Sequence, residues 1–85
     1  MNVSKSKICV VGAGYVGLSI ALSLSRHNPV DLLDIDEEKI RNINNKLSPL
    51  EEEDIKEYLS SKDLLLKGTT SHEEAYKESE IIILA

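Results

Sequence analysis

Three glycines at a fixed spacing give this sequence its clearest capacity for chemistry. Gly12, Gly14 and Gly17 follow a short apolar run and precede a stretch of helical character. In a turn from a strand into a helix, the first glycine permits the tight bend, the second lets an anion approach the backbone, and the third lets the helix pack closely on the sheet. Because N–H groups at the start of the helix bind such an anion, the spacing predicts a phosphate-binding turn. Its expected contacts are consecutive residues: Gly12, Ala13, Gly14, Tyr15, Val16 and Gly17.

An acidic residue provides the second candidate. Asp34 ends the second apolar run, where doubly wound nucleotide-binding folds place an acid that accepts hydrogen bonds from the adenosine ribose. A carboxylate there also repels the 2′-phosphate of NADP, and Asp36 close behind adds to that repulsion. The pair of features therefore predicts a dinucleotide site that takes NAD as its cofactor.

Other interpretations of both features stay open from the residues alone. Flavin-binding folds and adenosylmethionine-dependent methyltransferases use related glycine turns, and a plain strand-to-helix turn needs glycine only for backbone freedom. An acid at a strand end can face solvent or cap the next helix instead of binding a ribose. The occurrence of the two features at this spacing favours the NAD interpretation.

Strands and helices are expected to alternate around these candidates. Apolar and β-branched runs predict strands over four segments: residues 7–11, 30–34, 65–69 and 80–85. Helical spacing and capping residues predict helices over four others: residues 15–26, 37–46, 52–61 and 71–78. This alternation favours an α/β fold, a partial Rossmann fold with four parallel strands in the order 3-2-1-4. Residues 1–6 are expected to be a flexible lead-in, and residues 7–85 the N-terminal part of an NAD(P)-binding domain that is truncated before its substrate domain.

The pattern also predicts which side chains face the core and which cap helices. Asp31 is expected near the start of its strand or at a sheet margin, because a charge interrupts an otherwise apolar run. Asp36 is expected to cap the helix that follows it, and capping boxes are predicted at 48–51 and, more clearly, at 71–74. The inward-facing helical residues are expected to be Val16, Ile20, Ala21, Leu24, Ile40, Ile43, Leu47, Ile55, Tyr58 and Leu59.

Composition narrows the class of protein. The chain has 85 residues, a 41% hydrophobic fraction and a formal net charge of −5, so it forms at most one small domain with an aliphatic core. The acidic balance argues against nucleic acid as a partner, which needs a basic face. No apolar run approaches the roughly 20 residues that span a bilayer, and the single cysteine fits a reducing cytoplasm.

The remaining reactive side chains form no catalytic constellation. Cys9 is expected to be buried in the first strand as an inert small hydrophobe. His27 and His72 are expected to be surface or capping residues, and their spacing does not match a metal site. The acidic run 51–54 is interpreted as the solvated first turn of a helix. The sequence thus predicts no catalytic residue and no metal ligand within this chain.

Several longer strings resemble the N-terminal domain of the UDP-glucose 6-dehydrogenases, within the wider family of UDP-sugar dehydrogenases. The matching strings are Val10–Ser19, Leu33–Ile35 with Lys39, Asn42–Leu50, Ala75–Tyr76 and Ile81–Ala85. The run Gly-Tyr-Val-Gly-Leu is much more specific than the bare glycine pattern, and the Asn-x-x-x-Ser-Pro turn is similar to that of the shorter bacterial and archaeal members.

The resemblance implies an enzyme that oxidises UDP-glucose to UDP-glucuronate with two NAD, in nucleotide-sugar and polysaccharide biosynthesis. It also implies that the catalytic cysteine, its supporting residues and the sugar pocket lie downstream, so this chain alone is expected to be inactive. The NAD contacts carry over to Gly12–Gly17 and Asp34, and Lys39 matches a position that lines the adenosine side. An exposed helix lysine is the alternative for Lys39.

Two other functions remain as alternatives. A UDP-N-acetylmannosamine dehydrogenase or another UDP-sugar dehydrogenase would share this domain and differ only in the downstream pocket. A non-catalytic nucleotide-binding or interaction module is the second. In its favour, the strand at 80–85 is expected to lie at the sheet edge with uncovered aliphatic faces, which predicts self-association and a homo-oligomer.

Overall fold

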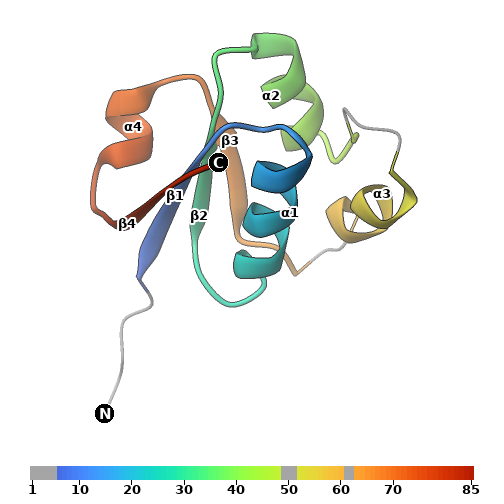
Figure 1. Ribbon diagram of the computed structural model, residues 1–85, viewed down its shortest axis with the longest axis horizontal. Helices are drawn as coiled ribbons and strands as arrows, with labels where there is room; N and C mark the ends of the chain where they lie inside the picture. Colours follow the sequence, from blue (N-terminus) through green and yellow to red (C-terminus); the bar gives the residue numbers. More distant parts are fainter. Residues whose placement is uncertain (1–5, 49–51, 61–62) are drawn as a thin grey trace.

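Four parallel strands lie side by side at the centre of the chain, in a computed structural model that describes residues 6–48, 52–60 and 63–85 (Figure 1). They are β1 (Lys7–Val11), β2 (Val30–Leu33), β3 (Leu66–Thr69) and β4 (Ser79–Leu84). The order across the sheet is β3-β2-β1-β4, and every neighbouring pair is parallel. The α/β class and the strand order predicted from the sequence are confirmed.

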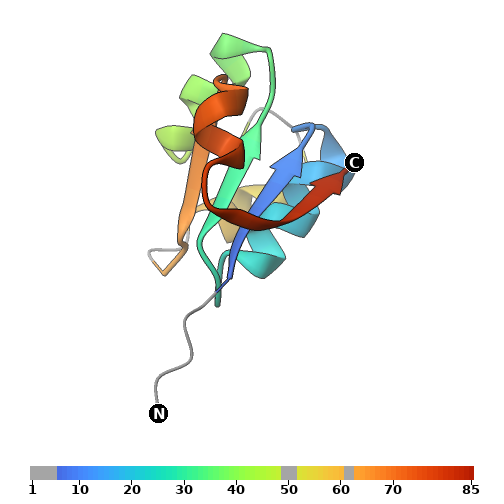
Figure 2. The same cartoon turned by 90° about the vertical axis from the view of Figure 1, so that its left-hand side faces the viewer.

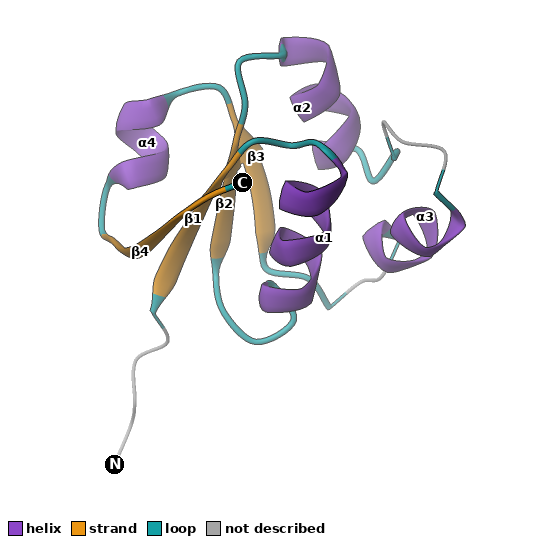
Figure 3. Ribbon diagram, in the orientation of Figure 1, coloured by secondary structure: helices purple, strands orange, loops and turns teal. Residues whose placement is uncertain are grey.

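Four helices cover the two faces of this sheet unequally. They are α1 (Tyr15–Leu24), α2 (Glu37–Asn44), α3 (Glu53–Leu59) and α4 (His72–Tyr76). Helices α1 and α2 lie on one face with α3 packed outside α1, and α4 lies on the other face (Figure 3). Seen from that second face, α4 stands in front of β2 and β3, while β4 runs past it uncovered (Figure 2). Within the described residues, no helix has the length and apolar character needed to cross a membrane.

The core is divided by the sheet, because alternate residues of β1 point to opposite faces. Ile8 and Val10 join a large cluster beneath α1, α2 and α3, whereas Cys9 packs with Leu33 and Ala75 beneath α4. Both faces of β1 are therefore covered, which explains its unbroken apolar run. Cys9 is fully buried as expected, and burial together with the negative charge of Asp31 raises the pKa of its thiol.

The inward face of α1 differs from the predicted one. Gly17, Leu18, Ala21 and Leu22 are buried, whereas Val16 is 60% exposed. The close approach of Gly17 to the preceding turn fixes the rotation of the helix, and this rotation carries Val16 to the outside. Ile20 and Leu24 are only partly buried against the core.

Two further residues predicted to face inward are exposed. Leu47 lies beyond the end of α2 and is 59% exposed, and Tyr58 borders the cavity between α3 and α1 and is 48% exposed. The helix α2 was expected to reach residue 46 but ends at Asn44, because Lys46 adopts a left-handed φ of 64°. The other inward residues of these helices, Ile40, Ile43, Ile55 and Leu59, are buried as predicted.

The predicted helix caps are present where the structure describes them. The Asp36 carboxylate accepts from the amide of Lys39 at 3.1 Å, and the Ser71 hydroxyl accepts from the amide of Glu74 at 3.2 Å. The reciprocal half of the second capping box runs through Thr69, whose hydroxyl accepts from the Ser71 amide and donates to the Glu74 carboxylate. Part of the capping box predicted at 48–51 lies outside the described residues.

Asp31 is the second residue of β2, near the strand start as expected, but β2 is an inner strand and not a sheet margin. Its side chain is only 10% exposed and lies 3.1 Å from Lys7 Nζ. The same ammonium donates to the carbonyl oxygens of Lys77, at 2.8 Å, and Glu74, at 3.2 Å. Lys7 thus compensates the buried carboxylate and satisfies carbonyls at the end of α4.

The outer edge of β3 is closed by a side chain. Asn44 Nδ2 donates to the carbonyl oxygen of Gly68 at 3.0 Å, and the Gly68 amide donates to Asn44 Oδ1 at 2.7 Å. A side-chain amide thereby occupies the hydrogen-bonding positions that another strand would use. A Cβ at Gly68 would lie 3.2 Å from both Asn44 Oδ1 and Ile40 Cγ2, so glycine permits this close approach of α2.

Candidate functional site

The turn between β1 and α1 requires glycine at its first and third motif positions. Gly12 has a φ of +106°, a conformation that other residues rarely adopt, and its amide donates to the Leu33 carbonyl at 2.7 Å. A Cβ at Gly17 would lie 1.7 Å from the carbonyl oxygen of Gly12. Gly12 therefore permits the tight bend, and Gly17 permits the close packing of α1 on the turn.

The second motif glycine faces open space. Gly14 is the N-cap of α1, and a Cβ built on it would have no heavy atom within 4 Å. The first bond of the helix runs from the Leu18 amide to the Gly14 carbonyl, so the amides of the three residues before Leu18 precede the helical ladder. The first turn of α1 contains no acidic residue, unlike those of α2, α3 and α4. This helix start is therefore sterically and electrostatically suited to an anion.

Asp34 lies directly beside this turn. Its Oδ2 accepts from the Ala13 amide at 2.8 Å, and its Oδ1 accepts from the Asp36 amide at 2.9 Å. Partial burial alone would raise the pKa of this carboxyl. The hydrogen bonds from Ala13 and Asp36, with the positive charge of Lys39, outweigh burial and lower the pKa below its ordinary value. Asp34 is therefore a carboxylate near neutral pH.

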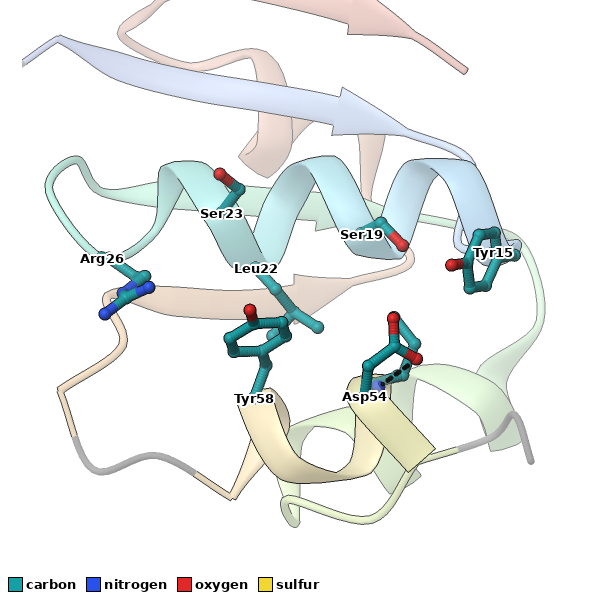
Figure 4. A pocket seen from close by; sticks show the side chains of 8 residues that line it. Tyr15, Ser19, Leu22, Ser23, Arg26, Asp54 and Tyr58 are labelled. Atoms are coloured by element: carbon teal, nitrogen blue, oxygen red, sulfur yellow. Dashed lines mark hydrogen bonds between the residues drawn. The ribbon is translucent and has the colours of Figure 1, made fainter. Parts of the chain in front are cut away.

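The predicted site residues are thus brought together at the carboxyl ends of β1 and β2. Lys39 lies on α2, where its charge acts on Asp34 and its amide binds the capping Asp36. Tyr15 and Val16 expose their side chains at the first turn of α1. The Tyr15 ring lies toward α3 and not over the glycine turn (Figure 4), so what Tyr15 offers to the turn is its backbone amide.

A hollow of about 280 Å³ opens next to Asp34 on the α4 side of the sheet edge. Its lining residues are Val11, Gly12, Leu33, Asp34, Ile35, Thr70 and His72. Sequence reasoning did not assign Ile35, Thr70 or His72 to a site. The predicted strand order could have indicated them. It makes β2 and β3 neighbours, so the residues that follow these two strands lie close together.

A second cavity, of about 220 Å³, lies between α1 and α3 (Figure 4). Polar groups of Tyr15, Ser19, Arg26, Asp54 and Tyr58 border it. Ser19 Oγ is buried without a hydrogen-bond partner among the described residues. The Asp54 carboxylate accepts from the amide of Ile55 at 2.9 Å, at the start of α3.

The glycine turn, the strand order and the acid at the end of β2 define the class of this protein. It is a dinucleotide-binding Rossmann domain in which the turn and the acid are joined by a hydrogen bond. Residues 6–85 match the NAD binding domain of the UDP-glucose/GDP-mannose dehydrogenase family, and the chain belongs to this family.

Individual relatives agree with that assignment. The UDP-glucose 6-dehydrogenase of Streptococcus pneumoniae is 40% identical over 79 residues, which cover 93% of this chain and 20% of that protein. A GDP-mannose dehydrogenase from Pseudomonas aeruginosa has a similar solved structure, with a TM-score of 0.81 and 31% identity over 92% of this chain and 19% of that one. The solved structure of a UDP-N-acetyl-mannosamine dehydrogenase from Staphylococcus aureus has a TM-score of 0.75 and 31% identity. The match covers 94% of this chain and 19% of that one. The chain thus spans about one fifth of the length of the relatives it matches.

Proposed function

We propose that this NAD-binding domain holds the cofactor through the α1 turn and Asp34. The amides at the start of α1 bind the pyrophosphate, with Gly14 leaving room for it, and Asp34 accepts the hydroxyls of the adenosine ribose. Lys39 supports the adenosine side through its charge. The observation that carries the proposal is the hydrogen bond from the Ala13 amide to Asp34 Oδ2, because it fixes the acid at the edge of the phosphate turn.

The same carboxylate makes NAD the preferred cofactor over NADP. A group with a lowered pKa is charged near neutral pH, and a 2′-phosphate would meet that charge at close range. Asp36, held next to Asp34 by its amide, brings a second carboxylate to the same strand end. The net charge of the chain, −5, does not oppose the binding of NAD, since the proposed phosphate contacts are backbone amides.

We propose further that the chain belongs to a UDP-glucose 6-dehydrogenase that oxidises UDP-glucose to UDP-glucuronate with two NAD. The 40% identity to the Streptococcus pneumoniae enzyme supports this substrate. When bound, NAD accepts the hydride, and the residues of this chain bind and orient it. The chain alone is expected to be inactive, because the sequence predicts no catalytic residue in it.

A UDP-N-acetylmannosamine dehydrogenase is the second candidate, favoured by the likeness to the Staphylococcus aureus structure. An assay of the whole protein with both UDP-sugars separates the two. NADH formed with UDP-glucose alone supports the first candidate, and NADH formed only with the acetylated sugar supports the second.

The cofactor site is tested by titrating NAD into the isotope-labelled chain and following backbone amide signals. Binding should shift the signals of Gly14 to Gly17, and NADP should bind more weakly. Gly14→Ala should keep the fold, because its Cβ meets no atom within 4 Å, and should lose NAD binding. If millimolar NAD leaves these amide signals in place, or if Gly14→Ala binds as the unchanged chain does, the proposed contacts are wrong.

Three finer proposals accompany this function. A cytoplasmic setting fits a lone buried thiol, Cys9, and a UDP-sugar dehydrogenase would supply precursors for polysaccharide biosynthesis. Self-association is proposed to run through β4, an edge strand whose Ile81, Ile82 and Leu84 side chains are between 47% and 78% exposed. A non-catalytic binding module remains the alternative if the whole protein oxidises no UDP-sugar.

A further inference from the structure

The cavity between α1 and α3 has no part in the proposed cofactor site. Two helices form its walls, whereas the glycine turn and Asp34 lie at the carboxyl ends of strands (Figure 4). Its volume of about 220 Å³ is smaller than the roughly 300–1,000 Å³ of pockets for drug-sized ligands. The cavity therefore has room for a single small ring and not for a dinucleotide.

Apolar and aromatic surface forms the base of this cavity. Leu22 of α1 and Ile55 of α3 line it, and both side chains are almost fully buried where the two helices meet. Tyr15 and Tyr58 border it from the two helices and are each about half exposed. Figure 4 shows Tyr58 and Asp54 reaching from α3 toward α1. A ligand in this cavity would thus meet apolar side chains and the flat surface of tyrosine rings.

Several polar groups at the cavity have no partner within the part of the chain that the structure describes. Ser19 Oγ is buried there without a hydrogen bond, although buried hydroxyls nearly always have one. The hydroxyls of Tyr15 and Tyr58 and the guanidinium of Arg26 likewise form no hydrogen bond or ion pair among the described residues. These groups are donors and acceptors that the described fold does not use, and a bound ligand would supply their partners.

The charges at the cavity select against a ligand with a net charge. Arg26 and Asp54 border it from opposite helices and form no ion pair with each other. A ligand of either sign would be attracted by one of these groups and repelled by the other. A zwitterion would satisfy both charges but would leave the hydroxyls of Ser19 and the two tyrosines without partners.

A neutral sugar ring matches the whole set of groups. Its hydroxyls each donate and accept, so they suit a carboxylate, a guanidinium and several protein hydroxyls at once. Its C–H faces are apolar and pack on aliphatic and aromatic side chains. We propose that the cavity between α1 and α3 binds the pyranose ring of a neutral sugar, with its hydroxyls on Ser19, Arg26 and Asp54. This site is separate from the cofactor site and does not depend on the proposed function.

The test is a titration of methyl α-D-glucopyranoside into the isotope-labelled chain, followed by backbone amide signals. The signals of Ser19, Arg26 and Tyr58 should shift, while those of Gly12 and Ala13 in the glycine turn should stay in place. A ring of this size is expected to bind with a dissociation constant on the order of a few millimolar. Saturation transfer from the protein to the C–H protons of the glycoside should confirm direct contact.

Three variants remove single contacts. Ser19→Ala and Tyr58→Phe should each weaken binding of the glycoside by about fivefold, the scale of one neutral hydrogen bond. Arg26→Met should weaken it by about tenfold, because its bonds are charge-assisted. Ser19→Ala removes an unpartnered hydroxyl and should unfold at the same urea concentration as the unchanged chain or a higher one. The matched controls are Tyr76→Phe and Arg41→Met at exposed positions on other helices, and both should bind the glycoside normally.

Three outcomes would overturn the sugar site. The first is an absence of shifts at Ser19, Arg26 and Tyr58 when the glycoside is well above a few millimolar. The second is unchanged binding in both Ser19→Ala and Tyr58→Phe. The third is that glycine betaine, a zwitterion, shifts these signals and the glycoside does not, which would mean that the ligand class is wrong. A chain that fails to bind NAD but binds the glycoside would refute the proposed function alone.

Discussion

The amide of Ala13 and the Oδ2 atom of Asp34 are joined by a hydrogen bond of 2.8 Å. Ala13 belongs to the turn after β1, and Asp34 follows β2, so this bond links the ends of two neighbouring strands. A second hydrogen bond, from the Gly12 amide to the Leu33 carbonyl, joins the same two strand ends. The glycine turn and Asp34 are therefore joined directly, and a change in one should affect the other.

Replacing Asp34 by Asn should destabilise the chain in a pH-dependent way. The pKa of Asp34 is lower in the folded chain than its ordinary value of 3.8, so its stabilising contribution is complete above that value and is lost as the pH falls through the folded-state pKa. At pH 7 the loss of charge-assisted bonds should cost about 1–3 kcal/mol. Urea unfolding at a series of pH values measures this, with Glu38→Gln as a surface control. A difference between the unchanged chain and Asp34→Asn that stays constant down to about pH 2 would contradict the linkage.

Two glycine substitutions should separate folding from binding. Gly17→Ala places a Cβ 1.7 Å from the Gly12 carbonyl oxygen, so the turn and the helix must move apart, at a cost of about 2 kcal/mol or more. Gly14→Ala meets no such atom and should cost about 1 kcal/mol or less, the scale of an N-cap change. Denaturant midpoints of the two variants give the comparison. Equal destabilisation would show that the close approach of α1 to its turn is not the constraint.

Removing the ammonium of Lys7 should be costly because Asp31 is nearly buried. Lys7→Met leaves that carboxylate without its partner and two carbonyls of the α4 region without a donor, which should cost about 3 kcal/mol. The double variant Lys7→Met with Asp31→Leu removes the unpaired charge and should recover part of the loss. Thermal unfolding of the single and double variants tests this, and a double variant less stable than Lys7→Met would refute it.

Opening the edge of β3 should weaken the sheet. Asn44→Ala leaves the amide and carbonyl of Gly68 without their side-chain partner, at an expected cost of about 1–3 kcal/mol. Asn45→Ala, at the neighbouring exposed position, is the matched control. Hydrogen exchange at the Gly68 amide reports the effect locally. Unchanged protection of that amide in Asn44→Ala would mean that Asn44 does not close this edge.

The opposite edge should govern self-association. Ile82→Lys and Leu84→Lys place charges on exposed positions of β4 and should shift the chain toward the monomer at high concentration. Light scattering across a concentration series measures this, with Leu47→Lys as a control that adds the same charge elsewhere. A chain that is already monomeric at high concentration would count against association through β4.

Much of this fold followed from local sequence patterns. Short β-branched runs alternating with helical spacing indicated the parallel sheet, and the setting of Gly12, Gly14 and Gly17 between a strand and a helix indicated the turn. The faces of the helices were harder to predict, since the contact of Gly17 with the turn fixes the rotation of α1 and no periodicity encodes that contact. Val16 is exposed for this reason.

Long-range polar contacts also escaped prediction. Asp31 interrupts an apolar run in β2, and its partner Lys7 lies on β1, so no local pattern pairs the two. The bonds between Asn44 and Gly68 join an exposed helix end to a distant strand in the same way. His72 was interpreted as a surface or capping histidine, and only the adjacency of the β2 and β3 ends brings it near Asp34.

The pairing of β1 also has a consequence for the order of events while a ribosome makes the chain. Its partner on one side, β2, follows soon after it, but on the other side Cys9 meets Ile82, near the far end of the sequence. Contacts between such distant residues form late. Beyond β4, the amide of Ala85 donates to the Val11 carbonyl at 3.0 Å, next to Gly12. The glycine turn is therefore synthesised well before Ala85, with which its neighbour Val11 pairs.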